Sequence, residues 1–186
     1  MIDTRLVLET ERLQLRPLAA DDVDLAIEMF TDPAVVKYVG GPMSVDDIRA
    51  EVPNWLRRGG DGCIGIWCIS DIETGEKYGS GALLPMPVEE DDTDWSLVVP
   101  GEMPACDVEF GFFLKQSAWG RGIGTEVCQR LLQFAFEDTE LQEIVAVVDE
   151  ANMASRRALE KAGFSHVGIV RAYGQDARGY RVTLDD

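Results

Sequence analysis

The chain has 186 residues, of which 46% are apolar and 27% are charged. This length predicts one globular domain over residues 1–186, because a second domain would have too little sequence to bury its own core. The net charge of −17 argues against nucleic acid and anionic membranes as partners, since both require a basic surface.

We expect a cytoplasmic protein. No stretch approaches the roughly 20 consecutive apolar residues of a membrane span, and the N-terminus lacks the apolar core of a signal peptide. The cysteines form no C-x-x-C pair and are expected to be reduced and mostly buried. They are Cys63, Cys68, Cys106 and Cys128. The single histidine, His166, lies in an apolar run, so we expect it to be structural and predict no histidine triad and no metal site.

The first part of the chain predicts one strand followed by two helices. Residues 6–18 read as an extended strand, and Asp21 or Asp22 is placed to cap a helix that continues to about residue 30. Ser44 and Asp47 resemble a capping pair at the start of a second helix, which runs towards residue 58. A proline inside this second segment disfavours a regular helix there.

A hairpin and an acidic segment come next. The β-rich runs 63–70 and 78–86 flank a charged turn with a glycine, and residues 87–105 carry three prolines and read as irregular. Between residues 78 and 114 there is no lysine or arginine, whereas acidic residues occur at Glu89, Glu90, Asp91, Asp92, Asp94, Glu102, Asp107 and Glu109. This segment favours a cationic ligand; the alternative is that its charge only keeps the protein soluble.

The second half predicts a strand, a helix, a strand, a helix and two closing strands. Residues 107–114 alternate in polarity as a strand does, and residues 122–138 have apolar side chains at helical spacing. Residues 144–148 are continuously apolar, which is typical of a strand covered on both faces. Asn152 can cap a short helix that ends at Gly163. The closing antiparallel pair is expected at residues 164–171 and 177–184. The order indicates a mixed α/β layer fold with a strand-helix-strand unit at its centre.

A glycine-rich turn lies where the predicted 107–114 strand leads into the following helix. Its sequence, from Trp119 to Gly124, is WGRGIG, and glycines at such a turn let backbone N–H groups approach an anion. A tight turn with no ligand would use the same residues. A Walker loop is excluded because no lysine follows Gly124, and a dinucleotide fingerprint is disfavoured by Val127, where it would require glycine or alanine.

Four ordered segments resemble the GNAT superfamily of N-acetyltransferases. They are EFGFFL at 109–114, WGRGIGTE at 119–126, NMASRR at 152–157 and EKAGF at 160–164. The opening LETERLQLRP at 8–17 is similar to the start of the RimJ/RimL-type branch, so the resemblance spans nearly the whole chain. It implies a mixed, mostly antiparallel central sheet flanked by helices, in which the strand of Glu109 and the strand of Ile144 are parallel and splay apart.

The same resemblance implies acetyl-CoA as the co-substrate, held in the gap between the splayed strands. The pantetheine would pair with the backbone of Phe112, Phe113 and Leu114, and Asn152 resembles the family asparagine that bonds this arm, although it is also a competent helix cap. Amides of the turn would hold the pyrophosphate, and the residues concerned are Trp119, Gly120, Arg121, Gly122, Ile123, Gly124 and Thr125. Trp119 stands where many members carry Gln or Arg, and we expect it to pack, with its N–H free to bond.

The chemistry needs a base, because alkyl amines titrate near pH ~10 and arrive protonated. Glu109 is the candidate base, unless it is only a solvated or salt-bridged carboxylate. A backbone N–H near Phe112 or Phe113 is placed to stabilise the oxyanion. Many members have a tyrosine acid where this chain has Leu159, so an acid role falls on Ser155, which could also bond the cofactor, or on no residue at all.

The expected function is direct acetyl transfer to a primary amine in a ternary complex. The acceptor would be a protein N-terminal α-amine or a small cationic amine such as a polyamine or an aminoglycoside. Cys106 and Cys128 have no histidine near them in sequence, which disfavours a thiol nucleophile and an acyl-enzyme. The alternatives are a non-catalytic acyl-CoA-binding or sensing module and a purely structural α/β protein. Exposed edge strands near the C-terminus could support a homodimer.

Overall fold

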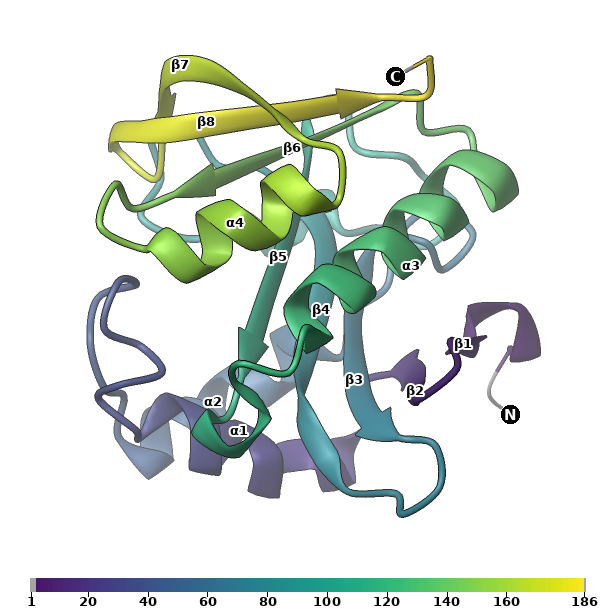
Figure 1. The fold of residues 1–186 in the computed structure, drawn as a ribbon, viewed down its shortest axis with the longest axis vertical. Coiled ribbons are helices and arrows are strands. Elements are labelled where there is room, and N and C mark those ends of the chain that lie inside the picture. Colours follow the sequence, from purple (N-terminus) through teal and green to yellow (C-terminus); the bar gives the residue numbers. More distant parts are fainter. Residues whose placement is uncertain (1–2, 186) are drawn as a thin grey trace.

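The computed structural model describes residues 3–185 and shows one eight-stranded sheet with helices on both faces (Figure 1). The strands follow the order β1-β2-β3-β4-β5-β6-β8-β7 across the sheet. In chain order, the strands and α-helices are β1 Leu8–Glu9, β2 Leu13–Pro17, α1 Val23–Phe30, α2 Val45–Trp55, β3 Gly65–Asp71, β4 Lys77–Pro85, β5 Val108–Leu114, α3 Ile123–Asp138, β6 Glu143–Val148, α4 Met153–Lys161, β7 Ser165–Ala172 and β8 Gln175–Thr183. The predicted fold class is confirmed.

The predicted single strand over residues 6–18 is wrong, because the chain folds back on itself at Thr10. The Thr10 hydroxyl accepts the N–H of Leu13 at 2.9 Å, and the Thr10 N–H donates to the Leu13 carbonyl at 2.9 Å. The two short strands β1 and β2 then pair antiparallel, with Leu8 opposite Leu15. A side-chain hydrogen bond that closes a tight turn has no periodic signature in the sequence.

The two expected N-terminal helices form, and α1 has the expected bounds, but its capping and the end of α2 differ from expectation. Asp22 occupies the N-cap position of α1 without a side-chain capping bond. Its carboxylate instead accepts the N–H of Ala19 at 2.9 Å and two charged hydrogen bonds from Arg16 at 2.7 Å each. Helix α2 is capped by the Ser44 side chain as predicted, and it ends at Trp55 rather than near residue 58.

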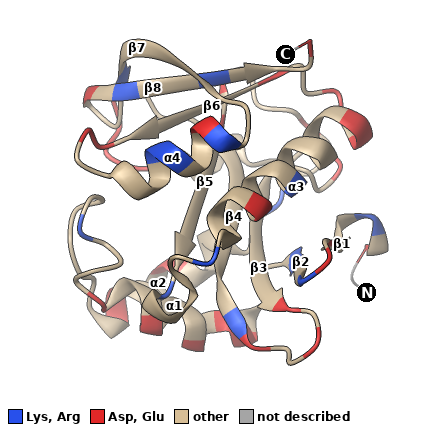
Figure 2. Cartoon of the chain, viewed as in Figure 1, with Lys and Arg blue, Asp and Glu red and all other residues tan. Residues whose placement is uncertain are grey.

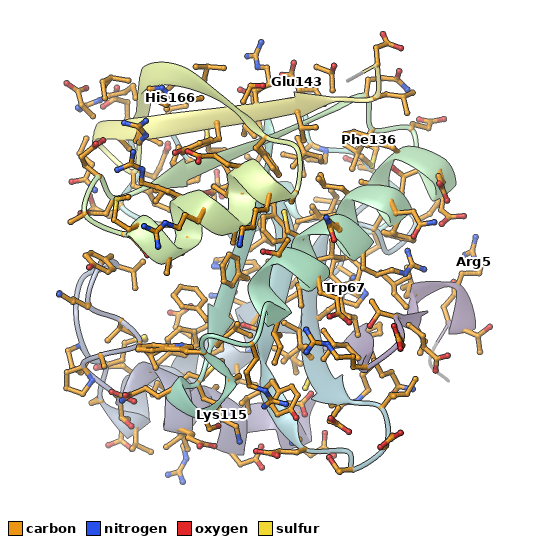
Figure 3. All side chains as sticks on the ribbon, in the orientation of Figure 1. Arg5, Trp67, Lys115, Phe136, Glu143 and His166 are labelled. Atoms are coloured by element: carbon orange, nitrogen blue, oxygen red, sulfur yellow. The ribbon has the colours of Figure 1, made fainter. Side chains whose placement is uncertain are left out.

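Alternate residues of β5 face opposite helical layers. The Phe112 ring packs so closely on Gly124 of α3 that a Cβ there would lie 2.8 Å from it. Phe113 points the other way and makes an edge-on contact with Phe30 of α1, with centroids 5.1 Å apart. Helices α3 and α4 therefore cover one face of the sheet, and α1 and α2 cover the other (Figure 1). The larger core lies under α3 and contains Trp67, which is completely buried (Figure 3).

The one parallel contact in the sheet joins β5 to β6 and is short. Its register consists of the single pair Glu109 and Val145, whereas β4 and β5 pair antiparallel along their full lengths. Beyond Glu109 the two strands diverge, as expected for the splayed pair. Because β6 loses its neighbour there, Val147 and Val148 are only partly buried, in contrast to the predicted coverage of both faces.

The remaining predictions concern cysteines, the histidine and membrane segments. All four cysteines are free thiols, and Cys106 is the exposed one, in a hollow shared with Gln142 and Val145. His166 lies on β7 at the outer edge of the sheet, against the ring of Tyr180 (Figure 3). Within residues 3–185, no helix is long and apolar enough to cross a membrane.

Candidate active site

Glu109 lies at the point where β5 and β6 begin to diverge. It is the second residue of β5 and is only 8% exposed. The Tyr173 hydroxyl donates a hydrogen bond to Glu109 Oε2 at 2.5 Å, and the backbone N–H of Val147 also bonds the carboxylate. Burial raises the pKa of Glu109 to about 7, and these two hydrogen bonds oppose the rise. A carboxyl group with this pKa can accept a proton at neutral pH.

The strand register decides which backbone groups of β5 face the gap. The Lys115 N–H donates to the Tyr78 carbonyl and the Met86 N–H to the Asp107 carbonyl, so odd-numbered residues between them bond β4. Phe113 is among these, and its N–H and C=O are directed at β4. The backbone groups of Phe112 and Leu114 point to the gap instead. Of the three predicted strand contacts, two therefore direct backbone groups at the gap, and the Leu114 carbonyl among them already accepts the Trp119 indole N–H.

The glycine-rich turn has the conformation that its sequence predicts. Gly120 and Gly122 have φ values of +69° and +74°, in the left-handed region where glycine is unstrained. Gly122 is the N-cap of α3, and Ile123, Gly124 and Thr125 open the helix. Among the described residues, none accepts a hydrogen bond from the backbone N–H groups of residues 120–125. These donors, together with the helix dipole, form a site suited to an anion.

Side chains from distant segments hold this turn in place. Arg12, from the turn between β1 and β2, donates to the Arg121 carbonyl at 2.8 Å and pairs with Glu126 at 2.7 Å. The Arg121 guanidinium lies over the Tyr78 ring, 4.8 Å from its centroid, and donates to the hydroxyl at 3.1 Å. The glycine-rich turn is therefore held by contacts with the β1–β2 turn and with β4.

Trp119 is less buried than its predicted packing role requires, whereas its N–H forms a hydrogen bond as expected. Trp119 is 46% exposed, so it does not pack into the core. Its indole N–H donates to the Leu114 carbonyl at 2.8 Å. That carbonyl is one of the groups facing the gap. Trp119 therefore ties the end of β5 to the start of the glycine-rich turn.

The start of α4 lies at the end of β6 and contributes polar side chains. Asn152 caps the helix, since its Oδ1 accepts the Ser155 N–H at 3.2 Å. This leaves the two amide hydrogens of Asn152 free to donate. Among residues 3–185, the Ser155 hydroxyl has no hydrogen-bond partner. Leu159 is 2% exposed and lies in the core, so no polar group occupies that position.

Charges of opposite sign gather on different parts of the molecule. Figure 2 shows basic residues on α4 and on the turn before α3, and mostly acidic residues on α1 and α2. The run Glu89–Asp92 is exposed and lies beside the turn between β7 and β8, where Arg171 pairs with Glu89 at 2.9 Å. The basic groups therefore accompany the anion-binding turn, and acidic groups lie on the side of Glu109.

Sequence reasoning missed two residues of this site. Tyr173 is distant from Glu109 in sequence, and only the predicted pairing of the last two strands hinted that it stands in a turn. Arg12 occurs in the opening segment quoted for the family resemblance, but its contact with Arg121 had no local signal. Contacts between residues more than 60 positions apart follow from the sheet order rather than from any motif.

Comparisons with known proteins identify the family of the chain. A family profile described as an acetyltransferase (GNAT) domain matches residues 12–165. The FsC-acetyl coenzyme A-N(2)-transacetylase of Aspergillus fumigatus is 29% identical over 168 residues, which cover 89% of this chain and 68% of the relative. The uncharacterized protein YkkB of Bacillus subtilis is 25% identical, with 96% of each chain covered. A putative ribosomal N-acetyltransferase of the same species, YdaF, is 27% identical over 72% of this chain and 64% of the relative.

Solved structures share the fold. A GNAT-family acetyltransferase from Bacillus anthracis superposes with a TM-score of 0.74 at 19% identity, covering 97% of this chain and 99% of that one. The aminoglycoside acetyltransferase AAC(6')-Ib in complex with coenzyme A gives 0.68 at 20% identity, with 92% and 94% covered. Spermidine N-acetyltransferase from Vibrio cholerae, in complex with CoA and spermine, gives 0.70 at 16% identity, with 95% and 98% covered. The chain belongs to the GNAT family of N-acetyltransferases.

Proposed function

We propose that the protein transfers the acetyl group of acetyl-CoA to the primary amine of a cationic acceptor by direct attack in a ternary complex. The observation that carries this proposal is the buried Glu109 carboxylate at the head of the gap, with a pKa of about 7. A base with this pKa is ionised for part of the time at neutral pH and can take a proton from an ammonium group, directly or through water.

The cofactor would lie in the gap between β5 and β6. The pantetheine amides would pair with the gap-facing backbone of Phe112 and with the Leu114 N–H, as an added strand does, and the Asn152 amide would donate to the same arm. The pyrophosphate would accept from the free N–H groups between Gly120 and Thr125. The fit rests on unpaired donors that converge on one gap.

Transfer then needs one bond formed and one broken. Glu109 first takes one proton from the ammonium group, and the free amine nitrogen then attacks the thioester carbonyl. As the carbon–sulfur bond breaks, the second proton of the nitrogen passes to the departing sulfur, so that CoA leaves as the thiol. The Phe112 N–H, which points into the gap, would stabilise the oxyanion. The unpartnered Ser155 hydroxyl would donate to the leaving sulfur, because the buried Leu159 offers no group for that role.

Two observations favour direct transfer over an acyl-enzyme. Cys128 is completely buried, and burial raises the pKa of its thiol. Cys106 is exposed, but the residues around it lie at the start of β5, before the gap opens, and partial burial and Asp107 raise its pKa. A low-pKa thiol is what a cysteine nucleophile requires. An acetylated enzyme formed in the absence of amine would contradict direct transfer.

The acceptor class is argued from charge. The acidic run Glu89–Asp92, beside the turn that contacts Glu109, would attract a cation. Two of the similar structures are described as aminoglycoside and spermidine acetyltransferases, which supports a small cationic amine. YdaF and the opening segment 8–17 favour the RimJ/RimL-like branch and a protein N-terminus as the second candidate. The free thiols agree with a reducing, cytoplasmic location.

The test compares wild type, Glu109→Gln and the control Glu143→Gln, a carboxylate on β6 that pairs with Arg181. CoA release is measured with spermidine, an aminoglycoside and a peptide with a free N-terminus. We expect kcat/KM to fall by about 10²- to 10⁴-fold in Glu109→Gln and to stay unchanged in the control. The stabilisation of each variant by acetyl-CoA is measured in parallel.

Each other outcome has its own meaning. Equal rates in wild type and Glu109→Gln would remove Glu109 from the mechanism. Stabilisation by acetyl-CoA without turnover of any amine would favour the acyl-CoA sensor. No stabilisation at a saturating concentration would contradict binding at the gap.

A further inference from the structure

The turn between β7 and β8 has an unusual backbone at Tyr173. Among the described residues, Tyr173 is the one non-glycine residue with a positive φ, at 54°, and Gly174 follows with a φ of +67°. Two consecutive left-handed residues are typical of a two-residue hairpin turn, which favours Asn or Gly at the first position. A bulky aromatic residue is costly in this conformation.

The backbone of this turn holds the acidic segment. The Tyr173 N–H donates to the Pro87 carbonyl at 3.1 Å, and the Gly174 N–H donates to the Val88 carbonyl at 2.8 Å. A Cβ on Gly174 would lie 3.2 Å from the Glu89 carbonyl oxygen, so the approach is close. The run Glu89–Asp92 is thus fixed next to the hairpin at its junction with β4.

The side chain of the same residue reaches the candidate base. The Tyr173 hydroxyl donates to Glu109 Oε2 at 2.5 Å, from the turn between β7 and β8 to β5. The turn lies at the end of the β7–β8 hairpin near the end of β6, where the gap opens (Figure 1). One turn therefore contacts both the base and the acidic segment beside it.

We propose that Tyr173 is the positioning residue of this active site: its hydroxyl orients the Glu109 carboxylate, and its turn fixes the acidic segment as the wall of the acceptor site. The proposal rests on the function proposed above. The strained backbone at Tyr173 is then explained, because only this turn brings a hydroxyl to Glu109 while its N–H groups hold Pro87 and Val88.

The groups that face the pair define how it titrates. From β6 the Val147 N–H bonds the carboxylate, and from the acidic segment Asp92 faces the Tyr173 phenol. Besides burial, the pKa of Glu109 is set by the hydrogen bonds from the Tyr173 hydroxyl and the Val147 N–H. Burial raises that pKa, and the Tyr173 hydrogen bond lowers it by stabilising the ionised form. Removal of the hydroxyl is therefore expected to raise it further.

The experiment compares Tyr173→Phe with the matched control Tyr180→Phe, whose hydroxyl donates to Glu160 at 3.1 Å, away from Glu109. For each variant, kcat/KM is measured from pH 6 to pH 9 and divided by the wild-type value at the same pH. The effect of ionisation of the amine substrate is the same in both and cancels in this ratio. We expect the Tyr173→Phe ratio to be about tenfold or more below one at the acidic end and to rise with pH, since a hydrogen bond to a charged group is lost. The Tyr180→Phe ratio should not change with pH.

A second measurement does not depend on turnover. Infrared difference spectra against pH report protonation of Glu109, and the band is assigned by its absence in Glu109→Gln. We expect the midpoint to move to higher pH in Tyr173→Phe, while thermal unfolding stays within a few degrees of wild type. A pH-independent ratio together with an unchanged midpoint would overturn the proposal. Equal activity of wild type and Glu109→Gln would instead overturn the base role, and the midpoint would still test Tyr173.

Discussion

Gly124 shows how the absence of a side chain allows close packing beside the proposed cofactor site. The Phe112 ring occupies the space that a Cβ at Gly124 would need, with ring carbons 2.8 and 3.0 Å from that point. The same ring anchors the part of β5 whose backbone faces the gap. The glycines of this turn therefore have two separate roles, because Gly120 and Gly122 adopt left-handed backbone conformations and Gly124 allows close packing.

We predict that Gly124→Ala lowers the free energy of unfolding by about 1 kcal/mol. Overpacking costs about 1–3 kcal/mol, and the better helix propensity of alanine returns up to about 1 kcal/mol. KM for acetyl-CoA should rise, because the added methyl group displaces the Phe112 ring and shifts the backbone of Phe112 that faces the gap. Urea unfolding and steady-state kinetics measure the two effects. The stability control is Gly111→Ala, where a Cβ meets nothing within 4 Å and no loss is expected. Equal stabilities of the two variants would contradict the packing argument.

At the scale of elements, β5 is a strand with two different edges. Odd-numbered residues bond β4, and even-numbered residues beyond Phe110 face the gap without a strand partner. Neighbouring amides of β5 therefore differ in whether they already have a partner in the sheet. An amide that bonds β4 can serve as an internal control for an amide that faces the gap when cofactor binding is measured.

We predict that coenzyme A protects the Phe112 amide from hydrogen exchange and changes the Phe113 amide much less. The Phe112 N–H gains a partner in the gap, whereas the Phe113 N–H is already in the β4 ladder. If exchange occurs only from the free protein, ligand at 100 times its Kd slows it by about 100-fold. Amide exchange followed by NMR, with and without coenzyme A, measures both. Protection of Phe113 alone would place the ligand on the wrong edge of β5.

The elements also show what the sequence could predict. Helices α3 and α4, strand β5 and the glycine-rich turn followed from apolar spacing, capping residues and glycine positions, which are local signals. The break at Thr10 and the role of Asp22 did not follow, because both depend on individual polar side chains that bond nearby backbone or distant cations. The Tyr173 contact with Glu109 required the final sheet order, in which β8 pairs with β6.

At the scale of the whole molecule, acidic residues outnumber basic ones by 34 to 17. Ion pairs such as that between Arg16 and Asp22 use part of the basic charge locally, and the remaining carboxylates repel one another. Screening by salt should therefore weaken a larger number of repulsive charge pairs than of attractive charge pairs. The excess charge opposes the compact state at low ionic strength.

We predict that the melting temperature rises by a few degrees between about 10 mM and about 300 mM NaCl, as the screening length falls from about 30 Å to below about 10 Å. Differential scanning calorimetry measures the shift. KCl should give the same result as NaCl, because screening does not distinguish the two cations. A melting temperature that falls with salt would show that attractive pairs dominate.

The hollow at the start of β5 has a practical consequence. Cys106 is the exposed thiol among four, and the other three lie in the interior, where burial raises the pKa of each. The native chain therefore carries one position open to a maleimide dye, without any engineered cysteine. Because the pKa of Cys106 is itself raised, labelling should be faster in mildly alkaline buffer. A fluorophore there would sit beside the first residues of the splayed strands and report on them while leaving the gap clear.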